Sequence, residues 1–457
     1  MTAPKSLRDR FRGELIMPGD PAYDERRAVW NGAIDRRPSL IARCSGVRDV
    51  QEAVRFAREC ELLVSVRGGG HNIAGLAVWD DAVMIDLSAL RTVRVDARRR
   101  TARADAGALW RDYDYETQAY GWSSPGGLNS TTGIAGFTLG GGFGWLSRLY
   151  GLACDNLLEV DVVGADGELI RAAPDENADL FWGLRGGGGN FGIVTSFEYR
   201  LHPVGPSVLC GMVFFAEEQI ADVLRVVREF GPAAPRELFV AATLRVAPFA
   251  AFLPETAHGT KVIAVGCLYS GSLEEGERVL EPLRRSLEPI AETIEPRPYT
   301  VWQQALDANW TRGFDNYWKA EYLASLSDEL IEVVVEHFGA LTSPLSDIKI
   351  GVLGGGAIGD VPPEESAYTH RAAPFILNIN TRWDDGEGER HVAWTQDFWE
   401  AARPFTAGGV YVNFLGQEGA GRVLEAYGAE KFERLVALKR RFDPTNFFRI
   451  NQNIPPS

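Results

Sequence analysis

One uncharged segment restricts the possible folds of this chain more than any other feature of its sequence. Residues 117–147 carry no charged side chain and include nine glycines and Pro125. The segment is long enough to cross a bilayer, but a lipid-facing helix is not built from so many helix-breaking residues. Glycine makes up 49 of the 457 residues, about 11% against a usual share of roughly 7%. We therefore expect this backbone to pack closely against a bulky group inside a folded protein, with no membrane partner.

A shorter glycine cluster follows a predicted strand. The apolar run 62–67 leads into Gly68, Gly69 and Gly70, and His71 comes directly after them. Successive glycines can direct several backbone N–H groups into one concavity, which suits a pyrophosphate. Taken alone, this motif fits a tight turn with a hydrogen-bonded surface histidine better than a binding site.

The uncharged segment changes that balance. It holds glycines 126, 127, 133, 136 and 140–142, together with the hydroxyls of Ser130 and Thr131. Small residues at this density leave room for a flat ring system beside the backbone, and the hydroxyls can bond phosphate or ring heteroatoms. Two glycine-rich loops about sixty residues apart in one α+β unit are improbable as coincidental turns.

A third glycine cluster is not a dinucleotide fingerprint. Residues 187–192 match G-x-G-x-x-G, but that pattern requires a strand before it and a helix starting on it. Here a predicted helix, 179–185, precedes the glycines and a predicted strand, 193–201, follows them. We therefore reject a Rossmann site. The sequence also lacks the P-loop, α/β-hydrolase and zincin motifs.

Charge and cysteine content exclude further classes of partner. The net charge is 47 − 62 = −15, and an acidic chain does not suit nucleic acid. Five widely spaced cysteines without C-x-x-C fit reduced, buried thiols in a cytosolic protein and neither a disulfide framework nor a zinc site. Residues 1–14 carry charge too early for a signal peptide, so a cytoplasmic location is expected. No metal site is expected, because the other histidines lack metal-ligand spacing: His202, His258, His337, His370 and His391.

The length predicts two or three domains. Helix and strand signals alternate over the first two hundred residues, and Asp166–Gly167 predicts a hairpin within 158–171. From about 207 to 383, strand-like runs alternate with acidic helical stretches, which suggests an α+β domain on an antiparallel sheet. The strands are expected at 208–215, 261–268, 348–353 and 376–383, the helices at 272–287 and 327–339, and a last single helix at 422–442.

At this point the sequence resembles a known family, the berberine-bridge-enzyme-like branch of the vanillyl-alcohol-oxidase flavoproteins, whose cofactor domain is called PCMH-type. The resemblance covers nearly the whole chain, and length and spacing are closest to 6-hydroxy-D-nicotine oxidase and bacterial secondary-metabolite oxidases. It implies an α+β, two-domain fold with an FAD-binding domain over 1–204, a substrate-binding domain with an antiparallel sheet over 205–405, and a C-terminal segment over 406–457 that completes the FAD-binding domain. The motifs that carry it are 37–43, the two glycine-rich loops, 411–414 and 439–448.

The resemblance also implies FAD joined covalently to His71 through its 8α-methyl group, a bond that holds the ring and makes it a stronger oxidant. Many relatives add a cysteinyl link from the later loop. That position falls at or next to Asn129 here, so a single covalent bond is expected. The residues expected to bind the cofactor are Arg67, Gly68, Gly69, Gly70, His71, Asn72, Gly75, Gly126, Gly127, Ser130, Thr131, Gly133, Ile134, Gly136, Gly140, Gly141, Gly142, Asn190, Gly192, Ile193 and Asn413.

Two catalytic residues are carried over from the same resemblance. Tyr411 matches the tyrosine of the family's Y-x-N-Y pattern, with Phe414 in place of its last tyrosine, and the alternative is a strand residue packed under the flavin domain. Lys349 matches a lysine that in some relatives lowers that tyrosine's pKa. Gly351 and Leu353 stand near Lys349, where an enzyme for a cationic nicotine-like amine would be expected to carry an acidic pair, and this departure disfavours nicotine itself. The aromatic-rich run Trp302, Trp310, Tyr317, Trp318 and Tyr322 is either pocket wall or core.

The resemblance, together with the two glycine-rich loops, implies an FAD-dependent oxidase that removes a hydride from a C–H next to oxygen or nitrogen in a small organic molecule. Tyr411 is expected to take the proton, and O₂ to regenerate the flavin with release of hydrogen peroxide. Two alternatives stay open: a sugar or oligosaccharide oxidase of the same family, and a biosynthetic flavoprotein with an oxygenase or cyclase role or with no turnover. The oligomeric state does not follow from the sequence.

Overall fold

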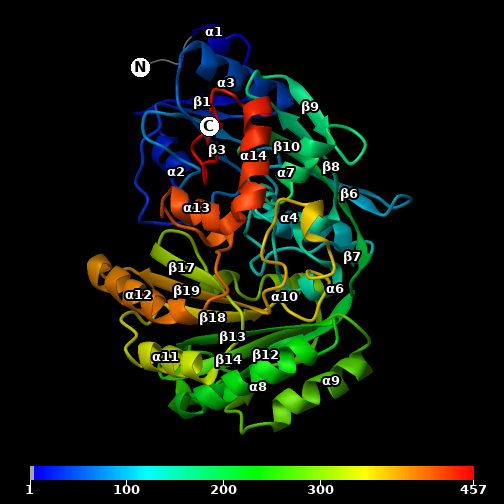
Figure 1. Ribbon diagram of the computed structural model, residues 1–457, viewed down its shortest axis with the longest axis vertical. Coiled ribbons are helices and arrows are strands. Elements are labelled where there is room, and N and C mark those ends of the chain that lie inside the picture. Colours follow the sequence, from blue (N-terminus) through cyan, green and yellow to red (C-terminus); the bar gives the residue numbers. More distant parts are fainter. Residues whose placement is uncertain (1–4) are drawn as a thin grey trace.

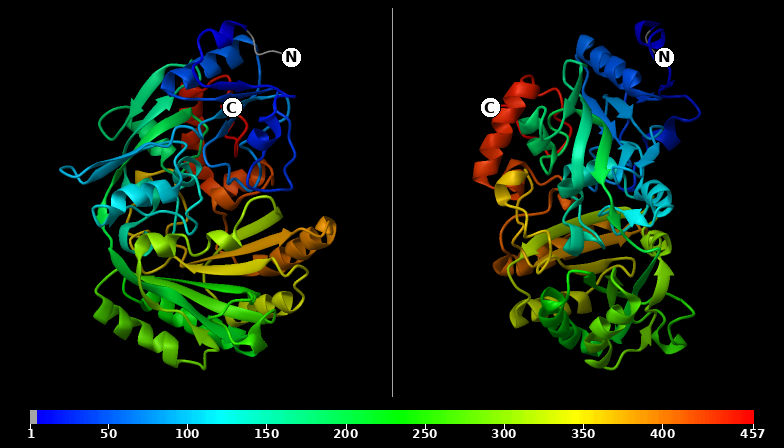
Figure 2. Two further views of the ribbon diagram at one scale, coloured as in Figure 1. Left: turned by 180° about the vertical axis from the view of Figure 1, so that it is seen from behind. Right: turned by 90° about the vertical axis from the view of Figure 1, so that its right-hand side faces the viewer.

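The computed structural model describes residues 5–457, so the first four residues of the predicted N-terminal domain and of the charged N-terminal segment lie outside the described part. The chain forms two parts, one above the other in Figure 1. The upper part holds the N-terminal elements together with the C-terminal helices, and the lower part is built on one large sheet. Figure 2 shows the C-terminal segment beside the N-terminal part from two further directions. This arrangement confirms the predicted two-domain α+β architecture.

The first sheet of the upper part carries the first glycine loop. Its strand order is β1 (Glu14–Ile16), β2 (Leu40–Arg43), β4 (Val83–Asp86) and β3 (Val64–Arg67). Strands β2 and β3 both run parallel to β4, and helix α3 (Val47–Glu59) makes the crossover between β2 and β3. Residues 68–71 therefore leave the end of a buried parallel strand, a position where such sheets place their ligands.

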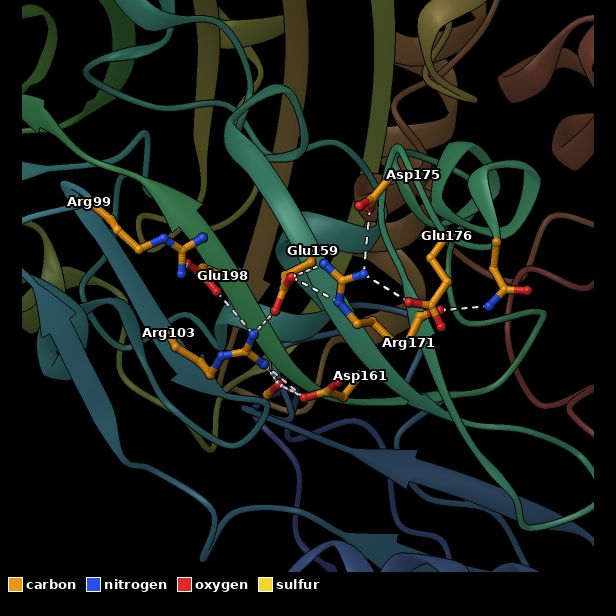
Figure 3. Close-up of polar contacts among 10 residues, drawn as sticks. Arg99, Arg103, Glu159, Asp161, Arg171, Asp175, Glu176 and Glu198 are labelled. Carbon is orange, nitrogen blue, oxygen red and sulfur yellow. Dashed lines mark hydrogen bonds and ion pairs between the residues drawn. The ribbon is translucent and has the colours of Figure 1, made fainter.

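The second sheet is antiparallel and has two chemically different faces. Its order is β5 (Val93–Asp96), β6 (Thr101–Asp105), β10 (Ile193–Arg200), β8 (Leu157–Val163) and β9 (Leu169–Ala172), and β8 pairs with β9 as the Asp166–Gly167 turn predicts. Val160, Val162 and Phe197 are fully buried on one face. The other face carries an ion network (Figure 3), in which Arg103 contacts Glu159, Asp161 at 2.8 Å and Glu198 at 3.0 Å.

The lower part is one mixed-length antiparallel sheet, as predicted. Its order is β15 (Ala291–Glu292), β12 (Ser207–Ala216), β14 (Lys261–Tyr269), β13 (Leu238–Val246), β18 (Asp347–Val352), β19 (Phe375–Trp383) and β17 (Asp315–Leu323), with β16 (Glu295–Pro298) also pairing with β12. Helices α8 (Ile220–Ala233), α9 (Leu273–Arg285), α11 (Asp328–Gly339) and α12 (Gly388–Ala402) cover the face turned away from the upper part (Figure 1).

Strand periodicity decides which side chains this sheet turns toward the upper part. Ile348 and Ile350 on β18, and Leu377 and Ile379 on β19, belong to the core under the helices. Since successive residues of a strand point to opposite faces, the residues between them face the other way. Lys349, Asn378 and Asn380 are thus directed at the upper part.

The C-terminal segment differs from its prediction. Residues 422–442 were expected to form one helix, but the structure has α13 (Ala420–Tyr427) and α14 (Ala429–Phe442), separated at Gly428. Gly428 has φ +71°, a left-handed conformation that ends a helix and costs glycine little. The reverse order around 187–192 is as predicted, with α7 (Ala178–Leu184) before the glycines and β10 after them.

The remaining elements are short connections. They are α1 (Lys5–Arg8), α2 (Tyr23–Arg27), α4 (Trp110–Gln118), β7 (Trp122–Ser123), α5 (Ile134–Leu139), α6 (Ser147–Tyr150), β11 (His202–Pro203) and α10 (Tyr299–Gln303).

Four of the five cysteines are buried as expected, whereas Cys60 is exposed at the end of α3. Within residues 5–457, no helix combines the length and apolar character needed to span a membrane, and no three His, Cys, Asp or Glu side chains are grouped to hold a metal ion.

Candidate active site

A cavity of about 330 Å³ lies where the glycine loops, the large sheet and the C-terminal segment meet. That volume is within the usual range for small-molecule and cofactor sites. Its walls come from segments far apart in the sequence: the loops at 68–72 and 127–140, strands β17 to β19, residues 411–414, and the final residues 448–452.

The two glycine loops touch each other through their backbones. A Cβ atom on Gly69 would lie 2.5 Å from Cα of Gly133, and one on Gly133 would lie 2.6 Å from Cα of Gly69. Real Cβ atoms are not accommodated at such distances. The absence of side chains at these two positions is therefore what lets the loops form one wall, and this contact explains the pairing of the two clusters that the sequence indicated.

Most of the predicted cofactor residues line this cavity. Those that do are Gly68, Gly69, Gly70, His71, Asn72, Gly127, Gly133, Gly136, Gly140, Asn190, Gly192, Ile193 and Asn413.

The other predicted cofactor residues are placed elsewhere, each for a visible reason. Ser130 is fully buried and donates its hydroxyl to Asp307 at 2.5 Å, so it does not face the cavity. Gly75, Gly126, Gly141 and Gly142 make room for neighbouring side chains, those of Ile34, Trp110, Tyr368 and Phe137 respectively, and Ile134 lies in the hydrophobic core. Arg67 and Thr131 line an adjoining cavity.

His71 stands at the boundary between the glycine loop and an aromatic wall. Its ring stacks on Trp30 with centroids 5.4 Å apart and an angle of 21°, and it is hydrogen-bonded to the backbone of Thr131. Burial away from water lowers the pKa of His71 to about 4. The imidazole is therefore uncharged at neutral pH and keeps a nitrogen lone pair.

Tyr411 is nearly inaccessible to solvent and lines the same cavity. Its hydroxyl oxygen accepts hydrogen bonds from the backbone N–H of Gly142 at 3.0 Å and from Nδ2 of Asn413 at 2.8 Å. Burial raises the pKa of Tyr411 well above its ordinary value of 10.0, with the charge of a Tyr368 phenolate adding to the shift and the two hydrogen bonds opposing it. The pKa thus moves in the direction opposite to the lowering that the family resemblance suggested.

Lys349 is held by groups other than Tyr411. Its Nζ lies 3.6 Å from the centre of the Trp310 ring and 3.7 Å from Oδ1 of Asp347. Burial lowers the pKa of Lys349 to about 8, while the negative charge of Asp347 opposes that shift. An amine with this pKa is partly uncharged near neutral pH and can exchange a proton there.

Several cavity residues were missed from the sequence. Trp30 comes from a segment with no motif, whereas Phe143 lies within the second glycine-rich loop but was not itself predicted. Asn378 and Asn380 had a readable signal: two amides alternating with Leu377 and Ile379 in a predicted strand. Of the predicted aromatic run, Trp310 and Trp318 line the cavity and Trp302, Tyr317 and Tyr322 do not.

Polar atoms inside the cavity fit a large heteroatom-rich cofactor. Oδ1 of Asn378, Oδ1 of Asn380, Nε1 of Trp318 and Oδ1 of Asn451 are buried and find no hydrogen-bond partner within the described chain. Buried polar atoms are normally paired, so such a set indicates a missing partner. Glycine walls for close backbone approach and several unpartnered amides together match a flat ring system with carbonyl and N–H edges.

Two family models and a full-length relative match this chain. Residues 38–173 match the family model "FAD binding domain" and residues 410–455 match "Berberine and berberine like". The chain is 30% identical over 461 residues to (R)-6-hydroxynicotine oxidase of Paenarthrobacter nicotinovorans, covering 98% of this chain and 97% of the relative.

Solved structures show the same fold. The crystal structure of 6-hydroxy-D-nicotine oxidase from Arthrobacter nicotinovorans superposes with a TM-score of 0.90 at 28% identity, covering all of both chains. Xylooligosaccharide oxidase from Myceliophthora thermophila has the same fold, with a TM-score of 0.86 at 22% identity over 99% of this chain and 98% of that one. With full-length similarity, both family models and the cavity in agreement, the chain belongs to the berberine-bridge-enzyme-like, PCMH-type family of FAD-linked oxidoreductases.

Proposed function

We propose that this protein is an oxidase of small organic molecules, acting on a C–H bond next to oxygen or nitrogen, with its FAD attached to His71. Bound FAD would supply a hydride acceptor that O₂ can reoxidise with release of hydrogen peroxide. The observation that carries the proposal is a single cavity onto which His71, Tyr411 and Lys349 all open. The name of the relative from Paenarthrobacter supports an oxidase in particular.

The surroundings of His71 support a single covalent link. Stacking on Trp30 and the hydrogen bond with the Thr131 backbone fix the ring, and the low pKa leaves it uncharged and nucleophilic. None of the described residues lining the cavity is a cysteine, and Asn129 occupies the wall where a second link would start.

Tyr411 and Lys349 are the two candidates to take the substrate's proton, and burial moves their pKa values in opposite directions. Tyr411, predicted to be the base, is a phenol at neutral pH because burial raises its pKa, and in that form it donates a hydrogen bond. Lys349, with a pKa of about 8, is the group able to accept a proton near neutral pH. We propose that Tyr411 holds the oxygen or nitrogen of the substrate and that Lys349 takes the proton.

The cavity favours an uncharged, flat substrate. None of the described lining residues carries a carboxylate, so nothing there would balance an ammonium group. Trp30, Trp310 and Trp318 pack on one another with centroids 5.5–6.1 Å apart and form an aromatic wall. We therefore propose aromatic alcohols as the preferred class, ahead of cationic amines.

Purified yellow protein should be screened for peroxide release with matched aromatic alcohols, amines and small sugars. Release with the alcohols supports the proposal, and release only with sugars would identify the oligosaccharide alternative. Anaerobic bleaching of the flavin without peroxide in air would instead point to a dehydrogenase or biosynthetic role. Colour that leaves with the supernatant after acid precipitation would refute the His71 link, and His71→Ala should lose its protein-bound colour under the same treatment.

A further inference from the structure

A second cavity, of about 450 Å³, adjoins the first. The two share Trp30, Gly68, Gly69, His71 and Trp310 as their common wall. The second cavity is strongly basic, although the chain as a whole has a net charge of −15. Its charged lining residues are Arg67, Arg91, Arg111, Arg312 and a single acid, Asp307.

Two of these groups already have hydrogen-bond partners inside the protein. Arg91 forms a two-pronged ion pair with Asp112, at 2.5–2.9 Å. Asp307 accepts the hydroxyl of Ser130 at 2.5 Å and its backbone N–H at 3.0 Å. Those two donors are neutral and leave the Asp307 carboxylate charged, so three guanidinium groups face one negative charge and an excess of two positive charges remains in the cavity.

Those three guanidinium groups have no carboxylate within ion-pair distance among residues 5–457. Among residues 5–457, Arg312 donates only to the carbonyl of Ala28, at 3.4 Å, and the exposed side chain of Arg111 has no hydrogen-bond or ion-pair partner. Arg67 donates Nη1 to the carbonyl of Arg26 at 2.5 Å, while its buried Nε has no acceptor in the described chain. Asp86 attracts Arg67 through space, and Arg312, Arg26 and Arg43 repel it.

The hydroxyl group of Thr131 is a further polar group in this second cavity that is unpaired within the described chain. Oγ1 of Thr131 is buried in the same lining and also has no hydrogen-bond partner among the described residues. Guanidinium groups bind carboxylate and phosphate oxygens through paired N–H donors, and a bound anion would relieve their mutual repulsion. A neutral ligand would not relieve that repulsion, and a cationic ligand would add to it.

We propose that this second cavity binds an oxoanion group, a carboxylate or a phosphate, through Arg67, Arg111, Arg312 and the hydroxyl of Thr131. The site is distinct from the oxidation chemistry proposed above and does not depend on it. Because Trp30 and Trp310 form the common wall, an anion bound there changes the environment of two indole rings beside the first cavity.

The test uses the purified FAD-loaded protein and inorganic phosphate at constant ionic strength. A saturable change in tryptophan fluorescence is expected, because two reporting indoles line the site. Arg111→Gln and Arg312→Gln should each weaken binding roughly tenfold or more, as loss of a hydrogen bond to a charged group does. Arg98→Gln, at an exposed arginine in the β5–β6 turn, is the matched control and should bind as the unaltered protein does.

A second arm separates the two sources of the anion. Benzoate is titrated beside acetate, with benzyl alcohol as its uncharged match. Tighter binding of benzoate than of acetate and phosphate, lost in Arg312→Gln, assigns the site to the acidic end of a larger molecule, whereas tighter phosphate assigns it to a free anion. Absence of saturation with every anion, or equal weakening by Arg98→Gln, would overturn the proposal.

Discussion

Lys439 is completely buried and joins the C-terminal segment to the rest of the FAD-binding part. Its Nζ donates to Oδ2 of Asp443 at 2.7 Å, to the carbonyl of Asn190 at 2.7 Å and to the carbonyl of Phe448 at 2.8 Å. The segment that begins at Phe448 forms one wall of the cavity. One ammonium group therefore positions that wall.

Lys439→Met keeps the length of the side chain and removes the charge. Asp443 then stays buried with backbone N–H donors from Phe447 and Phe448 but without its counter-ion. Removing one partner of a buried pair costs about 3–5 kcal/mol. For a unit of about 250 residues, the unfolding entropy of roughly 2.1 cal/mol/K per residue converts this cost into a fall in Tm of about 6–10 °C.

Thermal unfolding of the FAD-loaded protein, followed by tryptophan and flavin fluorescence together, measures this effect. Arg440→Met is the control, because Arg440 is exposed and, among residues 5–457, its side chain contacts only the carbonyl of Pro456. Lys439→Met combined with Asp443→Asn removes the stranded charge and should recover part of the loss. If Lys439→Met lowers Tm no more than the control, or if the double variant is no better than the single one, the buried pair does not hold the segment.

Two further predictions concern the cavity. The Lys349 ammonium, with a pKa of about 8, loses its proton as pH rises through that value, so kcat/KM should increase over the same range and Lys349→Met should abolish the increase. Asp347→Asn removes the negative charge that raises this pKa and should move the midpoint of the pH profile down by roughly 1–3 units. An unmoved midpoint would exclude Lys349 as the proton acceptor. Gly69→Ala places a Cβ 2.5 Å from Cα of Gly133, and it should lower the unfolding free energy by about 1–3 kcal/mol and reduce the amount of bound FAD. Gly421→Ala is the control, because no described residue lies within 4 Å of the added Cβ, and equal effects of the two substitutions would contradict the loop contact.

Much of the framework could be predicted from local sequence. The runs at 261–268 and 376–383 became strands β14 and β19, because alternation of side chains is visible over a few residues. The sequence also indicated that the two glycine clusters belong to one site. A backbone position with no room for a Cβ must be glycine, so the glycines stay visible in the sequence even though Gly69 and Gly133 meet only in the folded chain. The helix break at Gly428 was missed since the hydrophobic pattern continues across it.

The direction of individual side chains was decided only by tertiary structure. Ser130 donates its hydroxyl to Asp307, 177 residues away. Lys349 packs over the Trp310 ring, and burial raises the pKa of Tyr411. The sequence by itself determined where the backbone must be free of side chains and which strands alternate, because these requirements are met within a few residues. Which polar groups share a cavity, and which are taken by partners from distant segments, was settled by close packing of the whole chain, since a hydrogen bond or an ion pair depends on positions that local sequence does not specify.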